Sequence, residues 1–332
     1  MSEFDVLCIG NAIVDIIARA EDDFLHQNSI IKGAMNLIDA DRAELLYDRM
    51  GPAVETSGGS AGNTAAGVAS LGGKAAFFGK VADDHLGGIY RHDIRAQGVA
   101  FDTHPLSGTP PTARSMIFVT PDGERSMNTY LGACVELGPD DIEEDKVAGS
   151  AVTFFEGYLW DPPRAKDAIR KAAEIAHANN RQMSMTLSDP FCVDRYRDEF
   201  LDLMRSGTVD IVFANEEEMK SLYQTGDFET ALEAFRADCR VAIVTRSEKG
   251  SIAMTGSETA SVSAHEIDNL VDTTGAGDLY AAGFLYGYTK GHTLENCAHL
   301  GSLAAAVVIQ QIGPRPQISL HQAAIDAGLV KG

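Results

Sequence analysis

The chain has 332 residues, and 45% of them are hydrophobic, which is enough apolar side chain for the core of a globular protein. Its 48 acidic residues outnumber its 27 basic ones, and the resulting net charge of −21 opposes binding to nucleic acid or to an anionic membrane surface. The 5 scattered cysteines fit a reducing compartment and argue against disulfides and a structural zinc site. Because no secretory signal and no membrane-spanning apolar run is visible, we expect a cytoplasmic protein that contacts no membrane.

A short apolar run at residues 5–10 ends at a glycine and predicts a buried strand. It leads to Asn11 and Asp15, an amide and a carboxylate that lie among apolar neighbours. A buried polar group without a partner costs about 1–3 kcal/mol, so both side chains need hydrogen bonds. They either bond their own backbone in a turn at the strand's end or grip the hydroxyl groups of a ligand.

Residues 57–64 read Ser-Gly-Gly-Ser-Ala-Gly-Asn-Thr, and small residues continue to position 71. The glycines predict a tight loop that enters a helix packed closely against another element. The loop is not a P-loop, because the chain contains no Gly-x-x-x-x-Gly-Lys-Ser/Thr motif. The Rossmann fingerprint for dinucleotides is missing too, since no strand runs directly into Gly-x-Gly-x-x-Gly.

Two segments, about 16–38 and about 104–130, differ in pattern from the rest of the chain. In the second, residues 114–119 have the alternating pattern of a strand, and a Pro-Asp-Gly turn at 121–123 leads to Arg125. Alternation with such a turn predicts a β-hairpin.

From residue 152 onward, strand patterns alternate with helix patterns. Strands are predicted at 152–157, 183–187, 210–214 and 241–245, and helices at 164–178 and 194–204. The third and fourth of these strands are almost entirely apolar, as in strands buried on both faces. The pattern predicts an α/β fold with a doubly wound, mostly parallel sheet, whose ligands lie at the carboxyl ends of the strands.

The stretch 271–278 reads Val-Asp-Thr-Thr-Gly-Ala-Gly-Asp and precedes an apolar run with helical spacing. Its glycines let successive amides of Gly275, Ala276 and Gly277 point into one concavity at a helix N-terminus, which suits a phosphate. Asp278 then lies in the first helical turn. That position fits a helix-capping aspartate and also a carboxylate that accepts a proton in phosphoryl transfer.

Together these motifs resemble the two signatures of the ribokinase-like (PfkB) carbohydrate and nucleoside kinases, and the resemblance covers essentially the whole chain. Residues 272–278 are similar to the C-terminal signature, and residues 58–63 with 77–87 are similar to the N-terminal one. The resemblance implies a single three-layer ribokinase-like unit over residues 1–332. Within it, about 16–38 and 104–130 would form a small β lid over the substrate, and the remainder the large α/β domain.

The resemblance implies an enzyme that transfers the γ-phosphate of ATP, with Mg²⁺, to an alcohol group. It assigns Asp278 as the catalytic base and the amides of residues 275–277 as the anion hole. Arg125 resembles the lid arginine that reaches the transferred phosphate, although an arginine beside a turn is usually just solvated.

The same resemblance suggests residues for the nucleotide and the metal ions. Asn215 and Glu218 match an Asn-x-x-Glu motif that places Mg²⁺ through water, whereas an acidic helix start explains Glu216 and Glu217. Thr245 and Ser302 occupy expected ATP-contact positions. In several members the backbone near the positions of Asp272 and Thr274 holds a monovalent cation, so K⁺ is a further candidate cofactor. The 9 histidines show no metal-binding spacing.

Within the family, the chain most resembles the adenosine kinases. In members, the residues matching Gly58, Gly59 and Asn63 bind acceptor hydroxyls, and those matching Asn11 and Asp15 bind the ribose 2′- and 3′-hydroxyls. Candidates for the walls around adenine, each of which also fits core or lid packing, are Leu37, Leu131, Phe155 and Tyr158.

We therefore expect the 5′-hydroxyl of adenosine as the acceptor, which gives AMP in purine salvage. The Asp-Pro pair at 189–190 leans toward the sugar kinases, where adenosine kinases commonly have Ala-Pro. A sugar kinase of the ribose, fructose or ketodeoxygluconate type, or a kinase for another nucleoside, is the alternative.

Two other classes fit less of the sequence. A ligand-binding regulator that has lost catalysis is disfavoured by the intact Asp278 and both glycines of the anion hole. A dinucleotide-dependent oxidoreductase is disfavoured by the missing fingerprint. The expected partner is a small-molecule nucleoside or sugar, with no nucleic acid, and the sequence leaves both a monomer and a homodimer open.

Overall fold

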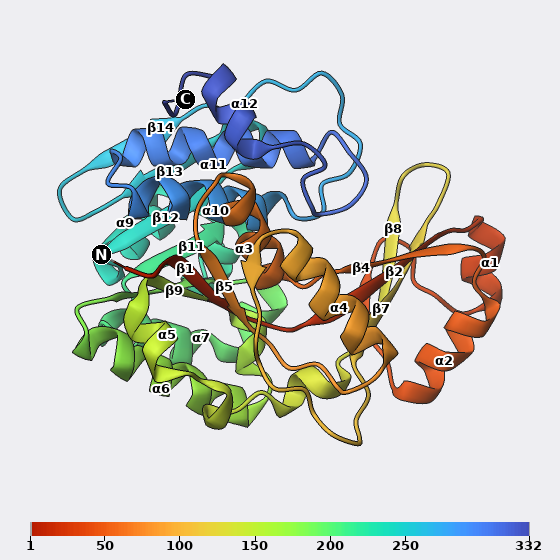
Figure 1. The fold of residues 1–332 in the computed structure, drawn as a ribbon. Helices are drawn as coiled ribbons and strands as arrows, with labels where there is room; N and C mark the ends of the chain where they lie inside the picture. Colours follow the sequence, from red (N-terminus) through yellow and green to blue (C-terminus); the bar gives the residue numbers. More distant parts are fainter. Residues whose placement is uncertain (1, 332) are drawn as a thin grey trace.

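The computed structural model describes residues 2–331 and contains two β-sheets (Figure 1). The large sheet has the strand order β14-β13-β12-β11-β10-β9-β1-β5-β6. Neighbours from β12 to β6 are parallel, and β13 and β14 extend the sheet antiparallel. The predicted mostly parallel sheet is thus confirmed. Its strands are β1 Phe4–Ile9, β5 Ala75–Phe78, β6 Val99–Ala100, β9 Ser150–Glu156, β10 Gln182–Thr186, β11 Ile211–Asn215, β12 Val241–Thr245, β13 Ser251–Met254 and β14 Thr259–Val262.

Helices cover both faces of the large sheet and give a three-layer fold (Figure 1). In β1, Val6 and Cys8 pack into one core and Leu7 and Ile9 into the other, because successive side chains of a strand point to opposite faces. The helices packed into the first core are α3 Ser60–Ser70, α4 His85–Ala96, α10 Ala276–Thr289 and α11 Leu294–Val308, with α12 Leu320–Asp326 against α11. Those packed into the second are α5 Glu144–Gly149, α6 Pro163–Ala178, α7 Pro190–Arg205, α8 Glu216–Leu222 and α9 Phe228–Asp238. Short 3-10 turns are η1 Gly132–Glu136, η2 Pro139–Asp141, η3 Gly157–Trp160 and η4 Ser247–Lys249.

The second sheet, which we call the small sheet, lies to one side of the large domain (Figure 1, right). Its order is β3-β8-β7-β2-β4, and β7 with β8 forms the predicted hairpin, with Ser115 opposite Thr129. β4 lies outside both segments that the sequence suggested for a lid, and β2 begins before the first of them. The elements of this part are β2 Ile13–Arg19, α1 Asp22–Gln27, β3 Met35–Leu37, α2 Ala40–Arg49, β4 Ala53–Ser57, β7 Ala113–Val119 and β8 Arg125–Tyr130.

The chain crosses between the two sheets at two of the predicted acceptor motifs. Residues 10–12 join β1 to β2, and Gly58 with Gly59 joins β4 to α3. The crossings lie side by side, because the amide of Gly58 donates to the carbonyl of Ile13 (2.8 Å). At Gly59, φ is +83°, and a Cβ atom would lie 2.1 Å from the carbonyl oxygen of Asn11, so only glycine fits.

The small residues of α3 let it pack closely against α10. A Cβ atom on Gly67 would lie 2.6 Å from the Cβ atom of Ala282, which confirms the close packing predicted for this helix. The N-terminus of α10 therefore meets the loop that precedes α3.

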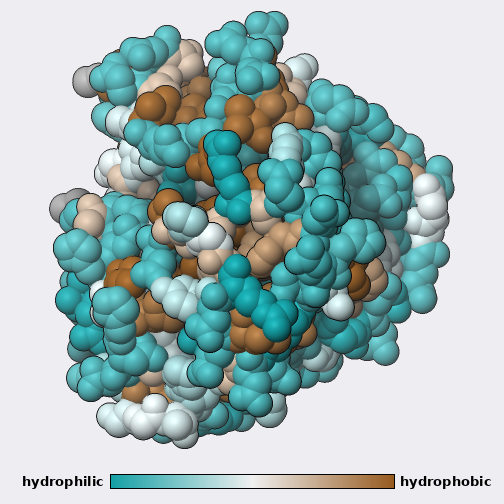
Figure 2. Space-filling view, turned by 90° about the vertical axis from the view of Figure 1, so that its right-hand side faces the viewer, coloured by the Kyte–Doolittle hydropathy of each residue, from teal (hydrophilic) through white to brown (hydrophobic). Residues whose placement is uncertain are grey.

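Seen from the side of the small sheet, the surface is mostly hydrophilic, with separate apolar patches between the polar groups (Figure 2). Within residues 2–331, no helix is both long enough and apolar enough to cross a membrane.

Candidate active site

Asp278 lies where α3 and α10 meet, and its carboxylate is held by the other helix. Ser60 Oγ donates to Oδ1 (2.6 Å) and Asn63 Nδ2 donates to Oδ2 (2.8 Å). The residue at the N-cap of α10 is Gly275, three positions earlier. Asp278 is therefore not a helix cap, and its carboxylate instead lines a pocket between the two sheets.

Burial raises the pKa of Asp278 above its ordinary value, although the hydrogen bonds from Ser60 and Asn63 and the positive charge of Arg315 oppose the shift. Burial also raises the pKa of Asp15 to about 7 and that of Glu156 to about 7, and the charge of Asp278 adds to both shifts. A cluster of carboxyl groups with raised pKa values in a pocket is typical of a site that moves protons near neutral pH.

The turn before α10 offers amides without partners. Gly275 has φ +79° and brings the chain into the helix, where a Cβ atom would lie 2.7 Å from Pro314 Cβ. The amide of Ala276 donates to the carbonyl of Thr273 (3.2 Å), whereas those of Gly275, Gly277 and Asp278 have no acceptor among residues 2–331. The free donors at this positive helix end suit an anion.

A buried carboxylate, Glu156 at the end of β9, organises the crossing between β1 and β2. Its Oε1 accepts from the backbone amide of Asn11 (3.0 Å) and from Asn11 Nδ2 (2.6 Å), and its Oε2 accepts from the amide of Ala61 (2.8 Å). Asn11 is thus fixed by Glu156 rather than by its own backbone. Asp15, on β2, is 8% exposed and lines the pocket.

The pocket has a volume of about 570 Å³, within the range of small-molecule sites, and has two unlike ends. Asn11, Asp15, Asn63 and Asp278 form a polar end. The apolar walls come mostly from the small sheet, from the turns after β8 and β9 and from the start of α7, and include Met35, Leu37, Ile117, Met127, Leu131, Tyr158 and Phe191. Phe155 does not line it, because this side chain is fully buried in the core and stacks on Trp160.

Arg125, at the start of β8, contacts the turn before α10 rather than solvent. Its guanidinium lies 2.5 Å from Asp272 Oδ2, and both side chains are 7% exposed. Asp272 also accepts from the amides of Thr274 (3.0 Å) and Gly313 (2.9 Å). The small sheet is thereby tied to the loop that carries the free amides.

Asn215 and Glu218, which the sequence assigns to the nucleotide and Mg²⁺, bind each other in a capping box at the start of α8. Asn215 Nδ2 donates to Glu218 Oε1 (2.6 Å), and the Glu218 amide donates to Asn215 Oδ1 (2.8 Å). Burial raises the pKa of Glu218 to about 7. Thr245 ends β12, and Ser302 Oγ accepts from the amide of His265 (2.8 Å), so Ser302 holds the segment after β14.

Sequence reasoning misses three functional side chains: Ser60, Glu156 and Arg315. Ser60 lies inside the glycine-rich loop, where the motif points to its neighbour Asn63. Glu156 ends a strand of apolar residues, and a carboxylate at such a position is a signal that could have identified it. Arg315 follows Gly313-Pro314, a pair that by itself indicates only the end of a helix.

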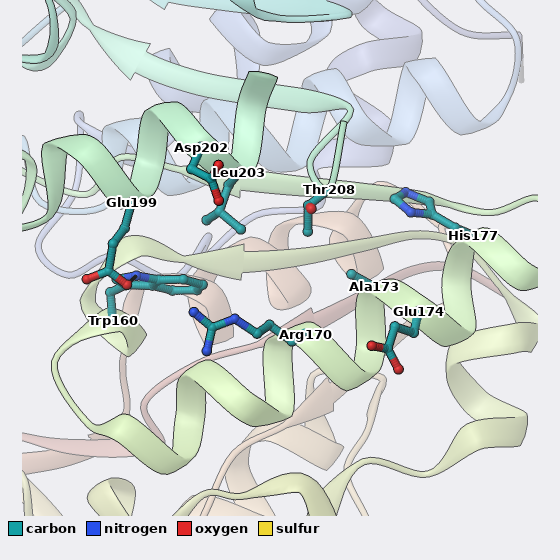
Figure 3. Close-up of a pocket in the computed structure, with 9 residues that line it drawn as sticks. All are labelled: Trp160, Arg170, Ala173, Glu174, His177, Glu199, Asp202, Leu203 and Thr208. Atoms are coloured by element: carbon teal, nitrogen blue, oxygen red, sulfur yellow. Dashed lines mark hydrogen bonds between the residues drawn. The ribbon is translucent and has the colours of Figure 1, made fainter. Parts of the chain in front are cut away.

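A second cavity of about 310 Å³ lies between α6 and α7, lined by side chains of both helices (Figure 3). Its Trp160 donates from Nε1 to Glu199 (2.7 Å), which Lys166 also contacts (2.8 Å). None of the predicted site residues lines it, whereas the pocket between the two sheets brings Asn11, Asp15, Asn63 and Asp278 together.

Comparison with known proteins shows which protein family the chain belongs to. The profile of the pfkB family carbohydrate kinases matches residues 4–320. The chain belongs to this family. Adenosine kinase from Sinorhizobium meliloti is 71% identical, with a TM-score of 0.93 over 98% of this chain and 100% of that one. A probable sugar kinase from Rhizobium etli is 69% identical, with a TM-score of 0.94 over 99% and 100%. Adenosine kinase from Saccharomyces cerevisiae is 27% identical over 93% of this chain and 96% of the relative.

Family membership makes the protein a phosphotransferase with an alcohol group as acceptor, in the nucleoside and sugar kinase group. It implies ATP as the phosphoryl donor, typically with Mg²⁺. The resemblance stated from the motifs, and the ribokinase-like fold, are confirmed.

Proposed function

We propose that this protein transfers the γ-phosphoryl group of ATP to the 5′-hydroxyl of adenosine and so produces AMP for purine salvage. The supporting observation is the two-ended pocket. A polar end with Asn11, Asp15 and Asn63 suits ribose hydroxyls, and the long apolar walls suit a purine ring that a simple sugar lacks. The similarity to the adenosine kinases of Sinorhizobium meliloti and Saccharomyces cerevisiae supports the same acceptor.

In this mechanism the ribose lies at the polar end of the pocket. Asn11, Asp15 and the Gly58-Gly59 turn bind its hydroxyls, and Asn63 Oδ1, which is buried without a partner among residues 2–331, accepts from one of them. Leu37, Leu131 and Tyr158 enclose the adenine. These contacts hold the 5′-oxygen beside Asp278 and convert the reaction into a positioned, in-line transfer.

Asp278 takes the proton of the 5′-hydroxyl as its oxygen attacks the γ-phosphorus, and the bond to the bridging oxygen breaks to release ADP. The amides of Gly275, Gly277 and Asp278, together with Arg125, stabilise the transferring group. Ala276 contributes through its fixed turn, since its amide already bonds Thr273. Closure of the small sheet as a lid, formed by about 16–38 and 104–130 together with β4, excludes water.

The donor set at the nucleotide side fits the implied cations. Amide and carboxylate oxygens of Asn215 and Glu218 suit Mg²⁺ held through water, which would neutralise charge on the phosphates. The carbonyls of Asp272 and Thr274 accept no hydrogen bond from residues 2–331, so they are free for a monovalent cation such as K⁺. Thr245 and Ser302 would contact the nucleotide.

A sugar acceptor is the second candidate, because Asp189 lines the pocket as a further polar group and a relative at 69% identity is named a probable sugar kinase. The test is ATP consumption with Mg²⁺ on adenosine, inosine, guanosine, ribose, fructose and 2-keto-3-deoxygluconate, with wild type and Asp278→Asn. Turnover on adenosine alone, lost in the variant, supports the proposal. Turnover on a sugar instead would overturn the acceptor, and no turnover on any would favour a regulator.

A further inference from the structure

Arg315 reaches from the C-terminal turn into the loop before α3. Its Nε donates to the carbonyl of Ser57 (3.2 Å), and its terminal nitrogens donate to Gly62 (2.6 Å) and Gly58 (3.4 Å). A further bond goes to Gln97 Oε1 of α4 (3.2 Å). A planar guanidinium with five donors can serve several carbonyls at once, which the ammonium group of lysine cannot do in the same geometry.

The segment that carries Arg315 also contacts residues 272–277, the turn before α10 that we call the anion turn. The amide of Gly313 donates to Asp272 (2.9 Å), and Pro314 packs against Gly275 and lines the pocket. Residues 313–315 thus contact the turn that offers the free amides and the segment 57–62, which leads into α3, the helix that carries Ser60 and Asn63. This segment thus adds a second connection between residues 57–62 and the turn before α10, beside the bonds from Ser60 and Asn63 to Asp278.

We propose that Arg315 is a positioning residue for phosphoryl transfer: it fixes the loop 57–62 against the N-terminus of α10, so that the acceptor hydroxyl is held at Asp278. The inference rests on the kinase chemistry of the proposed function and holds for whichever acceptor the enzyme uses. Arg315 contacts neither the reacting atoms nor Asp278 directly, and acts through the loop.

The guanidinium also places a buried positive charge among carboxylates. Its charge opposes the burial that raises the pKa of Asp278 and of Asp15, so removal of Arg315 should raise both pKa values further. The titratable and charged groups that face Arg315 or Asp278 are Cys8 on β1, Asp15 on β2, Tyr90 and Asp93 on α4, Glu156 at the end of β9 and, near Asp15, Arg125 on β8.

The experiment compares Arg315→Lys and Arg315→Met with wild type in steady-state kinetics across pH, with thermal melting of each variant. In Arg315→Met we expect an acceptor KM about tenfold higher from the lost loop contacts, and a kcat lower by up to about 100-fold from misplacement of the hydroxyl. The KM for ATP should change much less. The acid limb of kcat/KM should move to higher pH, because Asp278 must be ionised to act.

Arg315→Lys keeps the positive charge but loses the planar guanidinium that bonds several carbonyls at once. The acid limb of its pH profile should therefore stay in place, while its acceptor KM should still rise. The control is Arg95→Met, which removes an arginine that bonds the carbonyl of Phe101 and the carboxylate of Asp102 away from the pocket. The control should match wild type in both readouts.

An Arg315→Lys enzyme with wild-type acceptor KM would overturn the positioning role, and this result decides the matter even if Arg315→Met does not fold. Equal losses in the ATP and acceptor KM values, with an unmoved acid limb in Arg315→Met, would also overturn it. A wild type without phosphoryl transfer to any acceptor would instead refute the proposed function, so the two failures are distinguishable.

Discussion

The two sides of the candidate site are built differently. On the acceptor side, polar side chains from distant parts of the chain are already bonded to one another, as in the contacts of Glu156 with Asn11 and of Asn63 with Asp278. On the side that we propose for the nucleotide, beyond the pocket, the loops before α10 and after α11 instead expose apolar residues, which are Ile267, Leu270, Val271 and Ile312 at 37–58% exposure. The difference teaches that the side we propose for the acceptor is held by preformed polar contacts, whereas the side we propose for the nucleotide offers mainly backbone donors and apolar surface.

The largest expected effect is at Asp278. Asp278→Asn keeps the shape of the side chain but cannot accept a proton, so kcat should fall by about 10²–10⁴-fold. The KM for ATP should change little, because the anion turn remains. Rapid-quench assays of ADP formation measure the loss. The matched control is Asp238→Asn, a change at a carboxylate that pairs with Arg205 far from the pocket. A kcat near wild type in Asp278→Asn would refute the role of Asp278 as catalytic base.

Arg125 lies on the acceptor side but pairs with Asp272 on the other side, so it tests whether the two sides are separable. If Arg125 stabilises the transferring group, Arg125→Met should lower kcat by about 10²-fold. Asp272→Asn removes the pairing charge but leaves the guanidinium, and should cost less. Steady-state kinetics of both variants measure the difference, and equal losses would mean that the ion pair only holds the small sheet in place.

The apolar end should respond to the nucleobase and not to the sugar. Phe191 is 76% exposed and Leu37 is 58% exposed, and both line the pocket. We expect Phe191→Ala to raise the KM for adenosine about tenfold, from the loss of about 1.4 kcal/mol of aromatic contact. The KM for ATP serves as the internal control. An unchanged adenosine KM would show that the adenine ring binds elsewhere.

The smallest effect is on stability and follows from Asp15. Its pKa is raised to about 7 by burial, so the folded state binds more protons than the unfolded state between about pH 4 and 7. The contribution to stability is therefore full below the unfolded pKa and is lost as pH rises through about 7.

Asp15→Asn removes this titration and should gain roughly 1–4 kcal/mol over wild type at pH 8, while it matches wild type near pH 3. Urea unfolding at both pH values measures the difference, and Asp167→Asn on the exposed face of α6 is the control. A variant that is less stable at pH 8 would show that Asp15 is held by favourable contacts rather than strained by burial.

The sequence predicted the fold and the reaction class well because both depend on local patterns. Alternating apolar runs specify the parallel sheet, and the stretch 272–278 carries its backbone geometry in its own glycines. The assignment of Phe155 to the pocket was wrong, because β9 is buried on both faces of the sheet: Phe154 packs into one core and Phe155 into the other. The roles of Glu156 and Arg315 depend on tertiary contacts, such as the 253 residues between Arg315 and Gly62, which no local pattern reports.

The bond between Arg315 and Gly58 spans 257 residues of chain. Ribosomes add roughly 5–20 residues per second, so on the order of 13–50 s separate the synthesis of the loop from that of the arginine that fixes it. Throughout that interval the nascent chain already holds Asn11, Asp15 and Asn63 but lacks the arginine that bonds the carbonyls of residues 57, 58 and 62. If Arg315 positions the acceptor as we propose, catalytic competence arrives only when the turn after α11 emerges and docks.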